Sequence, residues 1–139
     1  MENKYSEDVR QHLSFIQGVI TRMNSNSFSM KGWMVAIVSA LCAVYASNST
    51  ADAAYVYIIA AFIADILFCF LDVYYLKKEK EYRKLYSKVL NSPVETDFNM
   101  KIEEEQNVCF CEAFKSTSAW LLYTVVAILH GVALHLVLR

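Results

Sequence analysis

Three stretches of the chain are almost entirely apolar, and each is about as long as a helix that crosses a bilayer. Residues 32–51 and 116–138 contain no Lys, Arg, Asp or Glu, whereas residues 53–76 are interrupted by Asp65 and Asp72. About 20 apolar residues form a helix that spans a hydrocarbon core of about 30 Å. The stretches are apolar on all sides, which is typical of transmembrane helices and not of the one-sided helices of a soluble bundle. We therefore predict three transmembrane helices.

The segments outside these stretches have the spacing of amphipathic helices. Apolar side chains recur every three or four positions between residues 6 and 23, with Ser6 placed as an N-cap. The second apolar stretch continues without a helix-breaking residue as far as Asn91 and Pro93. The sequence thus predicts a cytoplasmic amphipathic helix (1–31), a transmembrane hairpin turning at a polar corner at 48–52 (32–76), a cytoplasmic helix with an acidic loop (77–115) and a third transmembrane helix (116–139).

Positive charge predicts the orientation of the chain. Four Lys and Arg residues precede the first apolar stretch and eight lie between the second and third, whereas the corner at residues 48–52 has none. Segments rich in Lys and Arg stay in the cytoplasm. The first 27 residues are polar and lack the apolar core of a signal peptide, so we expect the N-terminus to be retained. The expected fold is an all-α, multi-pass inner-membrane protein with its N-terminus inside and its C-terminus outside.

Composition excludes several functions. Hydrophobic residues make up 56% of the chain and the net charge is −1, so there is no basic surface of the kind that binds nucleic acid. The sequence contains no phosphate-binding glycine loop, no HExxH and no nucleophile elbow. His130 and His135 lie about 140° apart on a helix and cannot share a metal ion. We expect no enzymatic activity, cofactor or bound metal; the expected partners are the lipid bilayer and further copies of the chain.

Polar residues inside the apolar stretches are candidates for a functional site. Asp65 falls near the middle of the bilayer, where a charged side chain costs at least about 2.5–3.5 kcal/mol. Ser39 and Thr124 lie at the same depth, with His130 one or two turns nearer the outside, and Asp72 shares the helix face of Asp65. Two interpretations stay open: a water-filled or proton-sensitive path, and an interhelical hydrogen bond that fixes packing.

Two further groups of residues indicate contacts with other molecules. Small residues three or four positions apart on the first span form a strip that favours close helix packing and a homo-oligomer. These are Ala36, Ser39, Ala40 and Ala43. Basic and aromatic residues in the cytoplasmic parts form a candidate interaction face for a possible partner protein. These are Arg22, Lys31, Tyr82, Arg83 and Tyr86.

The strings FIQGVITRMNSNSFSMKGW (15–33) and FLDVYYLKKEKEYRKLY (70–86) resemble small, poorly characterised bacterial inner-membrane proteins that look like effectors of anti-phage defence. The resemblance, over residues 15–86, implies an oligomer that forms or regulates a pore, or perturbs the membrane. A third span stands where two-span effectors have a soluble sensory domain, which argues against sensing of a nucleotide signal. The alternative is an accessory scaffold that recruits a cytoplasmic partner.

Overall fold

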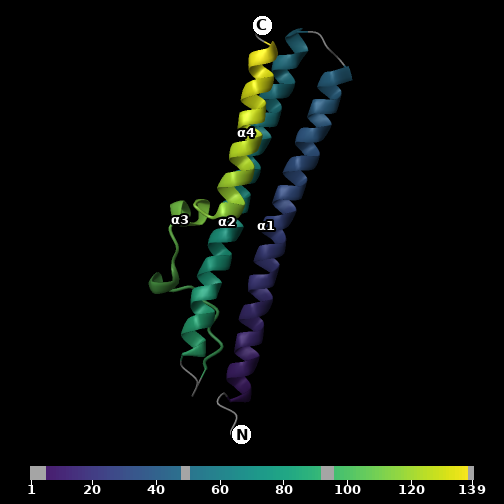
Figure 1. The fold of residues 1–139 in the computed structure, drawn as a ribbon. Coiled ribbons are helices and arrows are strands. Elements are labelled where there is room, and N and C mark those ends of the chain that lie inside the picture. Colours follow the sequence, from purple (N-terminus) through teal and green to yellow (C-terminus); the bar gives the residue numbers. More distant parts are fainter. Residues whose placement is uncertain (1–5, 48–50, 92–95, 138–139) are drawn as a thin grey trace.

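Long helices make up almost all of the structure (Figure 1). The computed structural model describes residues 6–47, 51–91 and 96–137, and this part of the chain contains no strand. Helices α1 (Glu7–Ser47) and α2 (Ala51–Leu90) form an antiparallel hairpin. A 3-10 turn (Glu104–Gln106) and the short helix α3 (Phe110–Phe114) lead into α4 (Thr117–Val137). The prediction of an all-α chain with three long helices, each apolar enough to cross a membrane, is confirmed.

The N-terminal amphipathic segment and the first apolar stretch form one uninterrupted helix. Sequence analysis treated residues 1–31 and 32–76 as separate parts, but α1 runs through their boundary at Gly32. No proline lies between residues 6 and 47, and each of the two glycines inside α1, Gly18 and Gly32, costs only about 1 kcal/mol. The hydroxyls of Thr21, Ser29 and Ser47 bond to carbonyls one turn earlier in the same helix. The polar segment therefore continues the helix instead of ending it.

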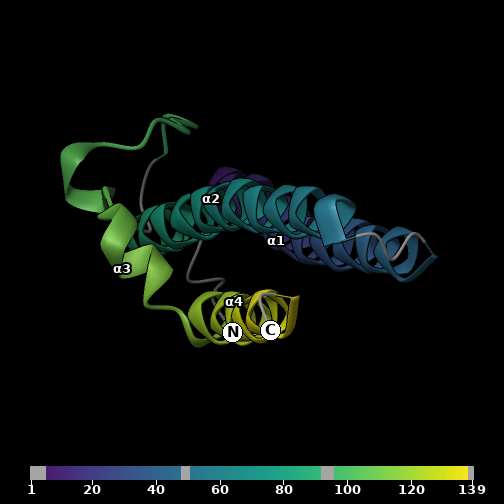
Figure 2. The same ribbon diagram turned by 90° about the horizontal axis from the view of Figure 1, so that it is seen from above.

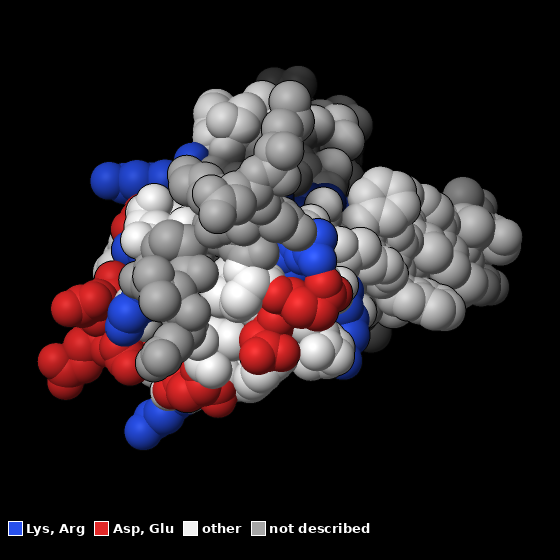
Figure 3. Space-filling view, turned by 90° about the horizontal axis from the view of Figure 1, so that it is seen from below, with Lys and Arg blue, Asp and Glu red and all other residues white. Residues whose placement is uncertain are grey.

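The hairpin is about twice as long as the hydrocarbon core of a bilayer is thick. Helices α1 and α2 contain 41 and 40 residues, which correspond to about 60 Å at about 1.5 Å per residue, against a hydrocarbon core of about 30 Å. Helix α4 has 21 residues and lies beside the apolar half of α2. Seen from the N-terminal end of α1, side chains of both charge signs surround the projecting end (Figure 3). The hairpin thus has an apolar half and a charged half that extends beyond it.

Helix α2 is the central element. Helices α1 and α4 both pack against α2 but on different sides of it, and α3 lies beside α2 (Figure 2). Beside α3, buried Val73 and Leu76 pack with Ala113 and Ala119. In the projecting half, the core is formed by Ile16, Ile20 and Leu85, packed against residues of the segment after α2.

Large apolar side chains cover the outside of the membrane half. On α2 they include Ile59, Ile63, Ile66 and Phe70, and on α4 they include Trp120, Ile128 and Leu129. An apolar exterior of this extent suits lipid and not water. Together with the three candidate spans, it indicates a multi-pass membrane protein. The predicted polar corner at residues 48–52 lies outside the described residues except for its last two positions, which begin α2.

Candidate functional site

An acid and a base meet in the middle of the apolar half. Nδ1 of His130 on α4 lies 2.9 Å from Oδ2 of Asp65 on α2, and the two side chains are 9% and 7% exposed. Neither the His130 Nδ1 atom nor either Asp65 oxygen makes a hydrogen bond of good geometry to any described residue, so the two groups approach closely at an angle that is unfavourable for a hydrogen bond. The Asp65 carboxylate therefore keeps unused acceptor capacity.

The other residues of the predicted intramembrane group do not join this pair. Ser39 and Thr124 are both exposed on the outside of the chain. On α1, Met34 and Val38 face α2, so Ser39 lies on the outer side. On α4, Tyr123 faces α2, so its neighbour Thr124 points away from α2. The Tyr123 hydroxyl donates to the carbonyl of Phe68 at 3.2 Å. Of Asp65, Ser39, Thr124 and His130, the structure thus brings only Asp65 and His130 together within one chain.

A second charged cluster joins α1 to α2 about 10 Å along α2 from the first. Lys31 Nζ lies 2.6 Å from Asp72 Oδ1 and 2.9 Å from Ser27 Oγ, and the Ser27 hydroxyl also donates to Asp72 Oδ1. Asp72, which the sequence placed on the helix face of Asp65, is fully buried. Lys31 was predicted on the cytoplasmic interaction face, but its side chain is 15% exposed and directed at Asp72. In the structure, Lys31 thus links α1 to α2.

Sequence analysis did not single out Ser27, although a signal was present. Ser27 and Lys31 are four residues apart and share a helix face. Ser27 also lies as many residues before Ser49 as Asp72 lies after Thr50, and Ser49 and Thr50 are at the predicted corner. Reading the hairpin outward from that corner would have paired the serine with the buried carboxylate.

The remaining residues of the predicted interaction face divide into two kinds. Tyr82 and Tyr86 are half-buried and pack against the Ile16, Ile20 and Leu85 cluster. Arg83 is exposed and pairs with Glu79 one turn earlier, and Arg22 is also exposed. The tyrosines thus serve packing within the chain, and the two arginines lie on the surface.

A buried glutamate fastens the segment before α4 to the projecting half of α2. Glu81 is 1% exposed and lies 2.8 Å from Lys78 Nζ and 3.5 Å from Lys77 Nζ, and it accepts the backbone N–H of Val108 at 3.4 Å. Burial alone would raise the pKa of Glu81, but the hydrogen bonds from Lys78 and Val108 and the charges of both lysines outweigh it and hold that pKa below its usual value. Lys80 and Lys84 add bonds to the carbonyls of Glu112 and Asn107.

Replacing Glu81 with Gln is expected to loosen this segment by about 1–3 kcal/mol at neutral pH, because the lysines and the Val108 N–H lose a charged acceptor. Because the pKa of Glu81 is lower in the folded state, the carboxylate stabilises the fold at pH values above its unfolded-state pKa, and this stability is lost as the pH falls through the folded-state pKa. The segment of the parent protein therefore loosens below about pH 4, whereas the variant depends less on pH. Hydrogen exchange at Val108 measures both effects. Glu104→Gln, at an exposed site, is the control and should match the parent; equal exchange in the Glu81 variant would contradict the assignment.

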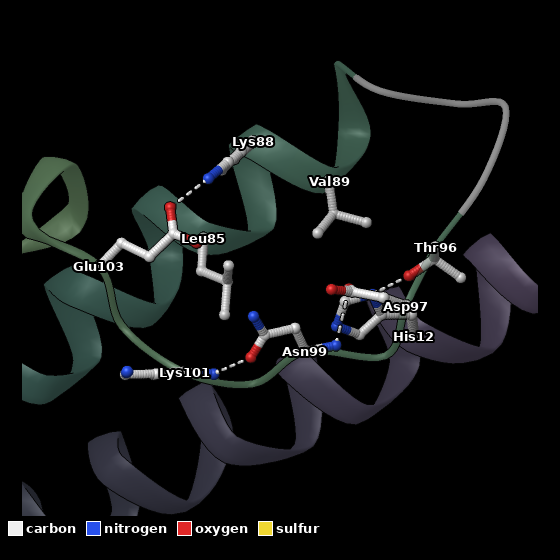
Figure 4. A pocket seen from close by; sticks show the side chains of 9 residues that line it. All are labelled: His12, Leu85, Lys88, Val89, Thr96, Asp97, Asn99, Lys101 and Glu103. Carbon is white, nitrogen blue, oxygen red and sulfur yellow. Dashed lines mark hydrogen bonds and ion pairs between the residues drawn. The ribbon is translucent and has the colours of Figure 1, made fainter.

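A pocket of about 420 Å³ lies at the end of the projecting half, between the last turns of α2, the segment from Thr96 to Glu103 and α1 (Figure 4). His12 of α1 is buried there and shares a hydrogen bond with the Thr96 hydroxyl through Nδ1, while its Nε2 has no partner among the described residues. Lys88 and Glu103 pair across the rim. The pocket is polar and partly charged, in contrast to the apolar half.

Comparisons with protein-family models, curated proteins and solved structures find no match to this chain. Among the described residues, no three His, Cys, Asp or Glu side chains gather in a way that could hold a metal ion. The described part brings acidic and basic side chains together in the apolar half at Asp65 and His130, near the border of that half at Asp72 and Lys31, and at the charged projecting end.

Proposed function

We propose that this chain is a self-associating membrane protein that forms or regulates an ion-permeable path through the bilayer, governed by Asp65 and His130. The observation that carries the proposal is the buried acid–base pair in the middle of the apolar half. Ionisable residues at that depth are costly and most often mark ion or proton pathways. A carboxylate with unused acceptor capacity is suited to interact with a cation or with water that enters between helices.

We infer self-association because the membrane half of a single chain leaves most of its surface free for a further copy as well as for lipid. Each of the three candidate spans has less than a quarter of its apolar window buried. In this proposal, a single copy does not conduct ions, because Asp65 and Asp72 each lie against a basic side chain of their own chain. A conducting path therefore needs several copies or a separation of these pairs.

The biological setting of the proposal comes from sequence. The charged end of the hairpin faces the cytoplasm, because Lys and Arg flanking the apolar stretches concentrate there. The membrane is the bacterial inner membrane, and its perturbation serves defence against phage, as the resemblance of residues 15–86 implies. A neighbouring gene for a nucleotide cyclase, a nuclease or a reverse transcriptase would support this setting, and an isolated gene would not.

Leakage of dye and of potassium from vesicles containing the purified protein tests the proposed activity. The parent is expected to release ions, and Asp65→Asn is expected to change the rate several-fold while leaving the oligomer intact, because asparagine keeps the size and hydrogen bonding but not the charge. Glu105→Gln, which removes an exposed carboxylate outside the apolar half, is the matched control. Tight vesicles at every protein density, with the oligomer intact, would overturn the proposed activity.

The projecting half supports a second candidate, a scaffold that recruits a cytoplasmic protein. It extends the hairpin well beyond the apolar stretches and ends in a polar pocket of about 420 Å³. Under this alternative the purified protein leaves vesicles tight. Under this alternative, Asn99→Ala in the pocket changes the phenotype that the protein causes in cells, whereas Asp65→Asn does not.

A further inference from the structure

Two cysteines lie on the surface in the segment before α4. Cys109 directly precedes α3 and Cys111 lies in the first turn of α3, and both are exposed. Cysteine is among the residues most often buried in folded proteins, where it acts as a small apolar side chain. Two neighbouring cysteines that are both exposed contribute little to packing, and their side chains are open to small reactants.

The backbone conformation of Cys109 brings the two thiols together. Inside a helix, side chains two positions apart point about 200° apart. Cys109, however, is the N-cap of α3 and has an extended conformation with ψ at 141°, which turns its side chain back over the first turn of the helix. The Cys111 thiol and the backbone N–H groups of Cys111 and Glu112 consequently lie close to the Cys109 sulfur.

The spacing of the two cysteines suits a disulfide. Phe110, which separates them, is the first residue of α3, and across one helical residue two Cα atoms lie about 5.4 Å apart. Disulfides usually join Cα atoms about 4.4–6.8 Å apart. The Phe110 ring stacks on Phe70 of α2, with 5.2 Å between ring centroids. The residue between the two cysteines is therefore anchored, while the cysteines themselves stay exposed.

The surroundings of Cys109 favour its thiolate form. The backbone N–H of Cys111, the Cys111 thiol and the backbone N–H of Glu112 lower the pKa of the Cys109 thiol below its usual value. The thiolate, and not the thiol, is the nucleophile. Redox-sensitive cysteines combine thiolate character, exposure and a second cysteine that resolves the first oxidation product. Cys109 and Cys111 together have all three features.

We propose that Cys109 and Cys111 form a reversible redox site that reacts with hydroperoxides. The Cys109 thiolate attacks one peroxide oxygen, the O–O bond breaks, and the other oxygen takes up a proton and leaves as water or an alcohol. The Cys111 sulfur then attacks the resulting sulfenic acid on Cys109, so that an S–S bond forms and the hydroxyl group leaves as water with the Cys111 proton. The two sulfurs lose two electrons, which the peroxide gains, and a thiol reductant restores both thiols by exchange.

The site lies at the joint between the projecting half and α4. Val108, just before it, donates its N–H to Glu81, and Ala113, just after it, packs against Val73 and Leu76. Oxidation therefore alters the chain where the segment before α4 is fastened to α2. The inference goes beyond the proposed ion path and does not depend on it, because the reaction needs only the two thiols and a peroxide.

Hydrogen peroxide added to the full-length protein in mild detergent tests the inference. After oxidation, a maleimide blocks the remaining thiols, and trypsin cleaves the denatured protein into fragments that include 102–115, with Cys109 and Cys111, and 32–77, with Cys42 and Cys69. Mass spectrometry is expected to show that fragment 102–115 loses two hydrogens and escapes the maleimide several-fold faster than fragment 32–77. Dithiothreitol added before the maleimide is expected to restore the labelling of both thiols.

Two variants separate the roles of the cysteines. Cys111→Ser is expected to stop the reaction at the sulfenic acid on Cys109, which dimedone traps. Cys109→Ser is expected to slow the oxidation of Cys111 several-fold, because the attacking thiolate is gone. Both substitutions are at exposed positions, and circular dichroism verifies that the variants keep the helix content of the parent.

Three results would overturn the inference. Equal rates of oxidation in fragments 102–115 and 32–77 would show that the pair has no particular reactivity. A disulfide that joins two copies, seen as a dimer on a non-reducing gel, would show that the geometry within one chain does not favour the bond. Oxidation of Cys111 at the parent rate in Cys109→Ser would contradict the assignment of Cys109 as the attacking group.

Discussion

Replacing Lys31 with Met is expected to lower the free energy of unfolding by about 3–5 kcal/mol, the usual cost of breaking a buried ion pair from one side. Asp72 is fully buried and Lys31 is its charged partner, so the substitution leaves a carboxylate with the Ser27 hydroxyl as its remaining donor among the described residues. A denaturant titration in mild detergent micelles measures the loss.

The double substitution Lys31→Met and Asp72→Leu is expected to recover most of that stability, because no buried charge remains. Ser27 can then bond to the carbonyl one turn earlier, as Ser29 and Ser47 do. Lys88→Met is the matched control, since its pair with Glu103 is half exposed and pairs of that kind contribute about 0–1 kcal/mol. A Lys31→Met protein as stable as the Lys88→Met protein would contradict the role assigned to the buried pair.

Replacing His130 with Leu is expected to destabilise the protein by about 2.5–3.5 kcal/mol, the insertion cost of an Asp charge at the centre of a membrane helix. Asp65 then loses the one basic group beside it in the described structure. The variant that also carries Asp65→Leu is expected to return close to the parent, because both groups become apolar.

His135→Leu is the control for this change. It places the same side chain five residues along α4, where the histidine is exposed and lies outside the pair with Asp65. The same denaturant titration, read through the fluorescence of Trp120 on α4 with Trp33 replaced by Phe in every variant, follows the release of that helix. If the two histidine variants unfold alike, the 2.9 Å approach of His130 to Asp65 does not stabilise the fold.

The long helices were predictable because their signals are local. Long apolar stretches predicted the spans, and the stop signal at Asn91–Pro93 predicted the end of α2, which lies at Leu90. The continuity of α1 was less evident, because the polar residues between Met23 and Gly32 interrupt the apolar pattern without ending the helix. The short helix α3 was missed, since five residues beside an acidic segment give little periodicity.

The pairing of side chains across helices was predictable only in part. Depth counting placed Asp65 and His130 in one group, but depth does not give the rotation of a helix about its axis. Ser39 and Thr124 have the right depth and the wrong rotation, so they are exposed. Lys31 looked like a surface residue because a lysine at the end of an apolar stretch usually extends toward water. The register between α1 and α2, which directs it to Asp72, depends on tertiary packing.

The absence of a break in α1 and α2 has a mechanical consequence. A continuous helix is stiff unless a proline, a bulge or an inserted group interrupts its hydrogen bonds, and α1 runs unbroken from the pocket at His12 to Ser47. Asp72 and Lys31 clamp the two rods together near the border between the charged and apolar halves. This pair thus holds the two rods in one register, so that a sideways push on the projecting end tilts both helices together as one body.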